Sequence, residues 1–219
     1  MSEADQIIEA MQLLFVSGVM SHSGHANASA RIPGVEGQML LTASGVMRGL
    51  TAKDLARVTF DGEAVEGALE SVAREIVGMH TVVYRERPAV NCVIHTHSPR
   101  VTAFALAHQP LPCRYEALLR FGVTGDIPVA AWAPRGSKEA VEYIQAQLVA
   151  HPDTPAVLLA NHGLLAFGAN PLAVASLIIA IEEAAEMTLD AQALGSGAQP
   201  FPDGALERER AHMRQFGSK

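Results

Sequence analysis

Five stretches of the chain carry apolar residues at the three- and four-residue spacing of an amphipathic helix. The first shows the pattern clearly, because Ser2 and Asp5 form a capping signal and Ile7, Met11 and Leu14 then recur on one face. Prolines stand after the second stretch and at the start of the last, where their fixed backbone angle ends or begins a helix. The pattern therefore predicts helices over residues 2–18, 71–87, 99–107, 137–148 and 171–194.

Short apolar runs lie between these stretches and are bounded by glycine, proline and polar residues, which is typical of β-strands. The predicted strands cover residues 39–42, 57–60, 90–95, 129–132, 158–160 and 164–167. Residues 21–31 are polar and contain glycine, so they predict a loop that could bind an anion, with a short strand at its end. Because several successive strands are joined by turns too short for parallel crossovers, we expect an α/β fold with a mixed, mainly antiparallel sheet.

The size and composition of the chain favour one domain. Its 219 residues can bury a substantial core, with two small domains as the alternative. Hydrophobic residues make up 49% and charged residues 18%, which excludes disorder and fits a large core or an apolar surface covered by subunit contacts. We therefore expect one domain over residues 1–219, in which residues 196–219 form a C-terminal surface tail with one short helix near residues 205–213.

Charge and targeting signals limit the partners and the compartment. The net charge of -7 and the lack of a Lys and Arg stripe argue against nucleic-acid binding. The first residues lack the features of a signal peptide, and no run of about eighteen apolar residues predicts a membrane span. We expect a cytoplasmic protein that does not enter membranes, in which Cys92 and Cys113 are reduced thiols.

One predicted strand ends in two histidines, His95 and His97, separated by a single residue. Alternate side chains of a strand share a face, so the two imidazoles would converge. Imidazole is a good ligand for zinc and related ions, and three protein ligands with one open position are typical of a catalytic metal site. The best third candidate is His162, which follows another apolar run and precedes Gly163, a residue that allows a sharp turn. The alternative is that His95 and His97 are two unrelated histidines.

Four motifs, in this order, resemble the class II aldolase and adducin family over residues 24 to about 194. The first two are Gly24-His25-Ala26-Asn27-Ala28-Ser29-Ala30-Arg31, similar to the family's Gly-Asn-x-Ser-x-Arg loop, and Leu41-Thr42-Ala43-Ser44-Gly45, similar to its Thr-Pro-Ser-Gly turn. The others are the segment from Met79-His80 through Pro88 into His95-Thr96-His97, and Asn161-His162-Gly163. Taken alone, the turn at Ser44 could cradle an oxyanion or be an ordinary turn.

The resemblance implies a fold, a metal and an assembly. The family fold is an αβα sandwich around a mainly antiparallel sheet, commonly assembled as a fourfold tetramer with active sites at subunit interfaces. The family binds zinc or a similar divalent ion through three histidines. The matching metal ligands here are His95, His97 and His162, and the matching substrate-binding positions are Asn27, Ser44 and Gly45.

The chain departs from the family at the carboxylate that transfers a proton. In family aldolases this acid lies four residues before the histidine that matches His80, in a Ser-Ser-Glu element whose serines hold the substrate phosphate. Here Ile76 stands at that position and Glu75 one residue earlier. We expect Glu75 to act as the acid/base through an irregular helix start, since in a regular helix the shift rotates the side chain by roughly 100°. The alternative is a first-turn acid that complements the helix dipole.

Two further residues have roles that the resemblance suggests. Ala73 and Arg74 replace the two serines, and an arginine can bind a phosphate or a carboxylate through paired hydrogen bonds, so Arg74 is a candidate substrate-binding residue. Tyr115 lies close to the position of a tyrosine that family aldolases use as an acid across the subunit boundary.

Two classes of function follow from the resemblance. The first is a metal-dependent lyase of the aldolase type, which cleaves or forms a carbon-carbon bond in a small hydroxy-ketone or sugar-derived substrate through a metal-stabilised enediolate. Related epimerases, dehydratases and decarboxylases use the same site. The second is a non-catalytic assembly module of the adducin kind. Three potential ligands favour the enzyme, because a scaffold has no physical reason to keep them converging.

Overall fold

The computed structural model describes residues 1–45 and 47–216. Its strands are β1 (Ala26–Arg31), β2 (Gln38–Thr42), β3 (Leu55–Thr59), β4 (Ala64–Glu66), β5 (Cys92–Thr96), β6 (Val129–Ala130), β7 (Ala156–Leu159) and β8 (Gly163–Gly168). They form one sheet in the order β4-β3-β2-β1-β5-β8-β7-β6, in which every pair is antiparallel except β6 with β7. The predicted α/β class and mainly antiparallel sheet are confirmed.

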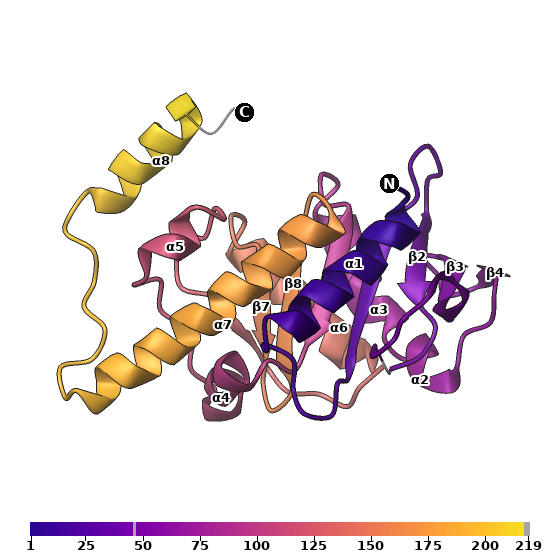
Figure 1. Cartoon of the computed structure of the whole chain (residues 1–219), viewed down its shortest axis with the longest axis horizontal. Helices are drawn as coiled ribbons and strands as arrows, with labels where there is room; N and C mark the ends of the chain where they lie inside the picture. Colours follow the sequence, from indigo (N-terminus) through magenta and orange to yellow (C-terminus); the bar gives the residue numbers. More distant parts are fainter. Residues whose placement is uncertain (46, 217–219) are drawn as a thin grey trace.

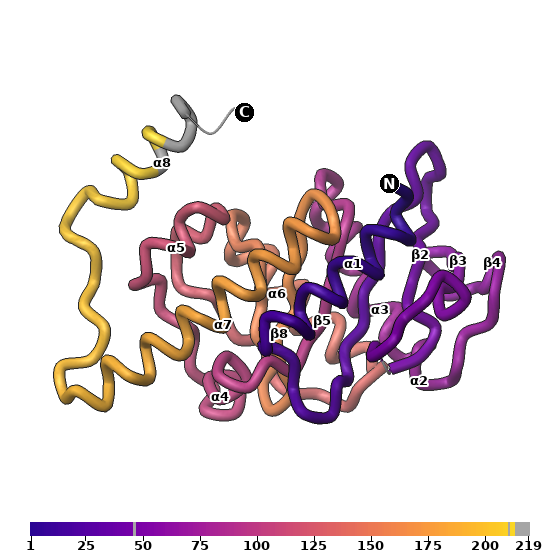
Figure 2. The backbone as a smooth tube through the Cα atoms, in the orientation of Figure 1, coloured from indigo at the N-terminus to yellow at the C-terminus, as the bar shows by residue number. Residues whose placement is uncertain are grey.

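Helices cover both faces of this sheet and make the αβα sandwich that the resemblance implies. They are α1 (Glu3–Val16), α2 (Ser71–Arg74), α3 (Val77–Glu86), α4 (Pro99–Ala107), α5 (Glu116–Leu119), α6 (Lys138–Ala150), α7 (Pro171–Ala193) and α8 (Ala205–Phe216), with a 3-10 turn η1 (Ala52–Asp54). The long helix α7 lies beside α1 on one face, and α3 and α6 pack together on the other (Figure 1). Helix α8 follows an extended connection from the end of α7 (Figure 2).

The two-residue period of the strands divides the core into two layers. In β5, Cys92 and Ile94 join the apolar cluster beneath α1, α4 and α7, whereas Val93 joins the cluster beneath α3 and α6. His95 therefore lies on the side of the sheet that α3 covers. The same alternation places Asn27 and Ser29 of β1 on that side, and Ala28 and Ala30 on the other.

Strand β1 confirms the strand expected at the end of residues 21–31 but is longer than predicted, so the loop is confined to the residues before Ala26. Its six residues pair with β2 on one side and β5 on the other, near the middle of the sheet. The polar composition suggested a longer loop because Asn27 and Ser29 are buried and form hydrogen bonds with His80 and Tyr84 of α3. Polar residues at alternate positions therefore mark a strand that contacts a buried polar network.

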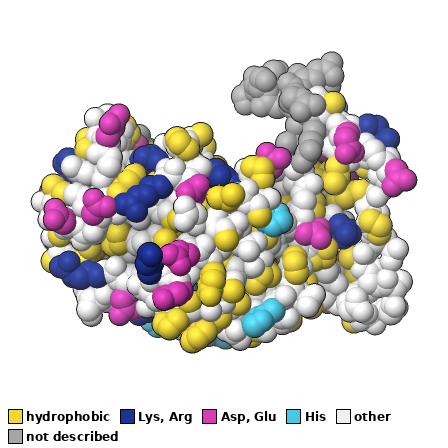
Figure 3. Space-filling view, turned by 180° about the vertical axis from the view of Figure 1, so that it is seen from behind, with side chains coloured by type: hydrophobic (Ala, Val, Ile, Leu, Met, Phe, Trp, Pro, Cys, Tyr) yellow, Lys and Arg dark blue, Asp and Glu magenta, His cyan; other side chains and the backbone are white. Residues whose placement is uncertain are grey.

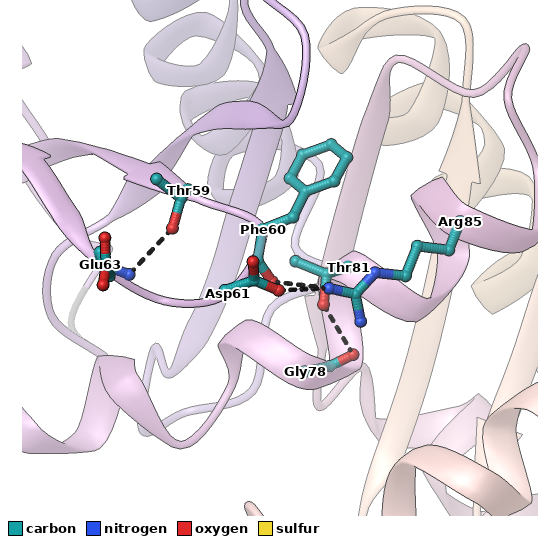
Figure 4. A network of polar contacts seen from close by, with 7 residues as sticks. All are labelled: Thr59, Phe60, Asp61, Glu63, Gly78, Thr81 and Arg85. Carbon is teal, nitrogen blue, oxygen red and sulfur yellow. Dashed lines mark hydrogen bonds and ion pairs between the residues drawn. The ribbon is translucent and has the colours of Figure 1, made fainter.

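The predicted helix over residues 71–87 is interrupted. It consists of α2 and α3, and Glu75 and Ile76 form the turn that separates them. The irregular helix start that Glu75 would need is present, at Glu75 and Ile76. Downstream, Arg85 of α3 forms an exposed ion pair with Asp61 in the turn after β3, at 2.7 Å between Nη2 and Oδ1. This pair connects α3 to the turn between β3 and β4 (Figure 4).

Glu182 of α7 is a buried acid, although acidic residues of a helix ordinarily face solvent. The Glu182 side chain is buried, and its carboxylate accepts hydrogen bonds from the backbone N–H groups of Arg100 at 2.7 Å and Val101 at 2.9 Å. These are unpaired donors of the first turn of α4, which Ser98 does not cap with its side chain. Burial raises the pKa of Glu182, and these two bonds oppose that rise.

Two surface properties complete the description. On the face that Figure 3 shows, Lys and Arg side chains are interspersed with Asp and Glu side chains. Among the described residues, no helix combines the length and the apolar character that crossing a bilayer requires.

Candidate metal centre and adjoining cavities

Three histidines from two parts of the chain converge at one end of the sheet. His95 is the penultimate residue of β5, His97 directly follows this strand, and His162 lies in the turn between β7 and β8. One ring nitrogen of each lies within 4.8 Å of the others. The Nε2 atoms of His95 and His97 are 3.0 Å apart. The structure thus brings together the three residues that the sequence predicts as ligands.

The orientation of His95 suits a metal ligand. Its Nδ1 lies 2.8 Å from the carbonyl oxygen of Leu164 in the neighbouring strand β8. Since a carbonyl only accepts, Nδ1 carries the proton and Nε2 presents a lone pair toward His97 and His162. A proton-bearing nitrogen fixed by the backbone and a lone pair directed at two other imidazoles match the donor set of a divalent ion such as zinc.

Gly163 is required beside the three histidines, though for a different reason than a sharp turn. A Cβ at this position would overlap the carbonyl oxygen of Thr96 and approach the rings of His97 and His95 at 3.0 and 3.3 Å. The residue that adopts the left-handed conformation is Asn161, with φ of 58°. Its Oδ1 accepts a hydrogen bond from His108 Nε2 at 2.7 Å, which ties the turn to the end of α4.

The three imidazoles are held in their neutral form. Burial, reinforced by His162 and His97, places the pKa of His95 well below its usual value. Burial is also the main reason why the pKa of His97 is lowered, and why that of His162 falls to about 4. The positive charge of Arg135 lowers both of these pKa values further. Neutral imidazole is the form that binds metal.

A cavity of about 110 Å³ opens beside the histidines. Three predicted substrate-binding residues, Asn27, Ser44 and Gly45, lie along its wall, as do His25 and Ile76. The complete lining is His25, Ala26, Asn27, Ser44, Gly45, Val72, Ala73, Ile76, His95, His97, Arg135 and His162. None of these described lining residues carries a carboxylate.

A closed hydrogen-bond network supports the position of Asn27. His80 of α3 is fully buried, with its Nε2 2.6 Å from Asn27 Oδ1 and its Nδ1 2.7 Å from Ser29 Oγ. The amide oxygen accepts, so His80 donates from Nε2 and accepts from Ser29, which in turn accepts from the Tyr84 hydroxyl at 2.8 Å. Burial lowers the pKa of His80 to about 3. The network leaves the Asn27 amide N–H group as the donor that faces the cavity.

A second cavity of about 210 Å³ adjoins the first, and Ile76, Arg135 and His162 line both. Glu75 lies in this second cavity, where its carboxylate accepts a hydrogen bond from Arg135 Nε at 2.8 Å. Ile76 occupies the side that faces the histidines, as the one-residue offset of the motif implies. The role of Glu75 as acid/base stays a prediction, since Glu75 lines the second cavity and is not among the residues that line the cavity beside the histidines.

The remaining predicted residues lie apart from both cavities. Arg74 is exposed at the end of α2 and lines neither cavity. Tyr115 stands at the start of α5, where the negative charge of Glu183 raises its pKa. It also lines neither cavity of its own chain, so a catalytic role would require a second copy.

Sequence reasoning missed Arg135 and gave no role to His25. Arg135 lies in the connection between β6 and α6, between Pro134 and Gly136. A charged residue in a proline- and glycine-containing loop after a strand is the signal that could have identified it, because loops at strand ends commonly carry binding residues. His25 stands inside the first motif, directly before β1.

Comparisons with known proteins agree with this geometry. Residues 5–189 match the family model described as Class II Aldolase and Adducin N-terminal domain. The chain is 31% identical over 201 residues to 3,4-dihydroxyphthalate decarboxylase of Arthrobacter keyseri, covering 84% of this chain and 79% of that protein. It is 33% identical over 175 residues to methylthioribulose-1-phosphate dehydratase of Hahella chejuensis, covering 75% and 82%. A solved L-fuculose 1-phosphate aldolase superposes with a TM-score of 0.84 at 25% identity, covering 97% of this chain and 96% of that one.

Proposed function

Because the chain belongs to the class II aldolase and adducin family, we propose that it is a metal-dependent lyase of the aldolase type, acting on a small hydroxy-ketone or sugar-derived substrate. The observation that supports this most directly is the convergence of His95, His97 and His162 beside a cavity lined by hydrogen-bond donors. These three histidines would hold a divalent ion, with zinc as our first choice, which would supply a Lewis acid for the enediolate chemistry of carbon-carbon bond cleavage.

The protein's own groups bind and orient the substrate. The Asn27 amide N–H group donates to a substrate oxygen, and its direction is fixed because His80 holds the other end of the amide. Ser44 and Gly45 supply a hydroxyl and a backbone N–H on the same wall. The walls formed by Ala73 and Ile76 exclude water from the reacting atoms.

Proton transfer in an aldol cleavage needs a base, and Glu75 is our candidate. A substrate that extends past His162 into the second cavity would reach its carboxylate.

We further propose that Tyr115 of a neighbouring copy supplies an acid. This role requires a homo-oligomer, which in the family is commonly a tetramer. Light scattering tests the assembly: a tetramer mass is expected at micromolar concentration, and a monomer mass would remove Tyr115 from the mechanism.

Decarboxylation is a second candidate, and one observation favours it. Aldol cleavage requires a base to take the hydroxyl proton. None of the described residues that line the histidine cavity carries a carboxylate that could serve as this base. In a decarboxylation the bond to the carboxylate carbon breaks, carbon dioxide leaves, the electron pair passes to the adjacent carbonyl, and a proton is then added to the carbon. That sequence needs an acid but no base. The decarboxylase relative supports this candidate for the present chain.

One experiment tests the proposed function and separates its variants. The purified protein, loaded with Zn²⁺ or Mn²⁺, is offered phosphorylated hydroxy-ketones and hydroxy-acids, and the release of aldehyde or of carbon dioxide is measured. Aldehyde indicates an aldolase and carbon dioxide a decarboxylase, and His97→Ala should abolish either activity. A protein that binds no divalent ion would overturn the enzyme assignment and favour an assembly module of the adducin kind.

A further inference from the structure

The second cavity combines an apolar wall with one cation directed at the histidine site. Its apolar side chains include Ile76, Met79, Trp132, Ile144 and Leu159. Its charged side chains are those of Arg135 and Glu75, and His162 stands at the junction with the first cavity. Small-molecule sites typically have this composition, an apolar surface with a few polar groups that fix orientation.

We propose that this cavity binds an apolar, carboxylate-bearing part of the substrate, of the size of a benzoate group, and that Arg135 recognises the carboxylate. The proposal rests on the lyase function above and names the substrate class: an aromatic hydroxy-acid or keto-acid, with its oxygens toward the three histidines and its ring between Trp132 and Ile76.

The geometry of Arg135 suits the recognition of a carboxylate. Its Nε donates to the Glu75 carboxylate at 2.8 Å, which orients the guanidinium group. No described residue accepts a hydrogen bond from its two terminal nitrogens. A fixed guanidinium with two free N–H donors on one edge binds a carboxylate through paired hydrogen bonds. Because Arg135 lines both cavities, such a carboxylate would lie beside the junction at His162.

The residues around the second cavity favour a carboxylate over a phosphate. Arg135 is already paired with Glu75, so one positive and one negative charge lie side by side there. The two serines that hold the phosphate in family aldolases are replaced here by Ala73 and Arg74, and Arg74 lines neither cavity.

The cavity is large enough for one ring. Its volume of about 210 Å³ exceeds the roughly 150 Å³ of an engineered cavity that binds benzene. Trp132 is the single tryptophan of the chain, and it stands at the wall of the cavity with 59% of its surface exposed. A ring that enters the cavity would cover this indole, which gives a direct optical signal.

The test uses the full-length protein after removal of metal with a chelator, and benzoate as the probe. Trp132 fluorescence and calorimetry measure binding of benzoate and of benzyl alcohol, which keeps the ring and lacks the carboxylate. Arg135→Gln removes the cation, and Arg135→Lys keeps the charge without the planar group. Arg85→Gln is the matched control, because Arg85 is also ion-paired (Figure 4) and does not line either cavity. Circular dichroism confirms that each variant is folded.

The expected result is saturable quenching of Trp132 by benzoate, with benzyl alcohol bound roughly tenfold or more weakly. Arg135→Gln should weaken benzoate binding by a similar factor, Arg135→Lys by less, and Arg85→Gln should have no effect. Equal affinity for the two probes, unchanged benzoate affinity in Arg135→Gln, or no quenching at millimolar benzoate would overturn the proposal. Because benzoate binding is measured without metal, its absence would leave the lyase assignment intact. Conversely, a protein that shows no lyase activity could still bind benzoate in this cavity.

Discussion

The buried His80 of α3 and the three histidines of the candidate metal centre lie on the same side of the sheet, and the ring nitrogens of the two sites have different partners. In the His80 network, both nitrogens are bonded within the protein, to Asn27 and to Ser29. At the candidate metal centre, His95 uses one nitrogen for the Leu164 carbonyl and directs the other toward His97. Burial lowers the pKa in both groups, so the pKa alone does not separate a structural histidine from a ligand.

The difference lies in which lone pairs remain available. A histidine whose two nitrogens have protein partners has no donor atom for an ion, and it serves to orient a neighbour. A histidine fixed through one nitrogen presents the other in a defined direction, which is what a metal requires. Variants that alter either the His80 network or the candidate metal centre, one at a time, test this distinction.

The largest expected effect is the loss of metal from a triad variant. His97→Ala removes one of three protein ligands, so bound zinc should fall from about one ion per chain toward zero, as measured by elemental analysis after gel filtration. The matched control is His80→Gln, which should keep its metal while losing stability. Equal metal content in the two variants, or loss of metal only from His80→Gln, would contradict the comparison.

The next effect concerns proton transfer to or from the substrate, because neither the His80 network nor the histidine triad contains a carboxylate among the described residues. If Glu75 acts as acid/base, Glu75→Gln should lower turnover by roughly 10² to 10⁴, with metal content unchanged. Normal turnover in this variant would show that Glu75 only holds Arg135 in place, and would strengthen the decarboxylation candidate. Arg85→Gln again serves as the surface control.

The pH dependence of stability should report His80. Its pKa is about 3 in the fold and its ordinary value is 6.5, so between these values the unfolded chain binds the additional proton. The contribution of His80 to the free energy of unfolding is therefore fully present above pH 6.5 and falls by roughly 1.4 kcal/mol per pH unit as the pH drops through this window. Urea titrations of the wild type and of His80→Gln should differ by this slope, since glutamine does not titrate. Identical slopes would show that His80 can bind a proton in the folded state.

The smallest effect is expected at the far end of the His80 network. Tyr84→Phe removes the hydroxyl that donates to Ser29 and keeps the ring, which stacks on Phe60 with centroids 5.3 Å apart. The free energy of unfolding should decrease by about 1 kcal/mol, as for the loss of one buried hydrogen bond. Denaturant titration measures this change, and metal content should not alter. A loss of metal in this variant would mean that the network and the triad are coupled.

The sequence predicts the strands and the triad because both depend on short-range patterns. His95 and His97 share a face by the two-residue period, and His162 stands at the end of another apolar run. Arg135 could not be found in this way, since it meets His162 only through the packing of the β6–α6 connection against the α2–α3 turn. The same limit explains β1 and Glu182: a polar residue predicts a solvated position unless its buried partner, tens of residues away, is known.

The capping of α4 by Glu182 has a thermodynamic consequence for the metal centre. Helix α4 begins two residues after His97, and the backbone N–H groups of Arg100 and Val101 in its first turn are satisfied only when α7 is docked against it. The segment that carries the histidines and the helix that caps α4 are therefore expected to unfold together. An ion that binds only the folded chain stabilises this whole unit, so it should slow hydrogen exchange along the distant helix α7 as well as at the histidines.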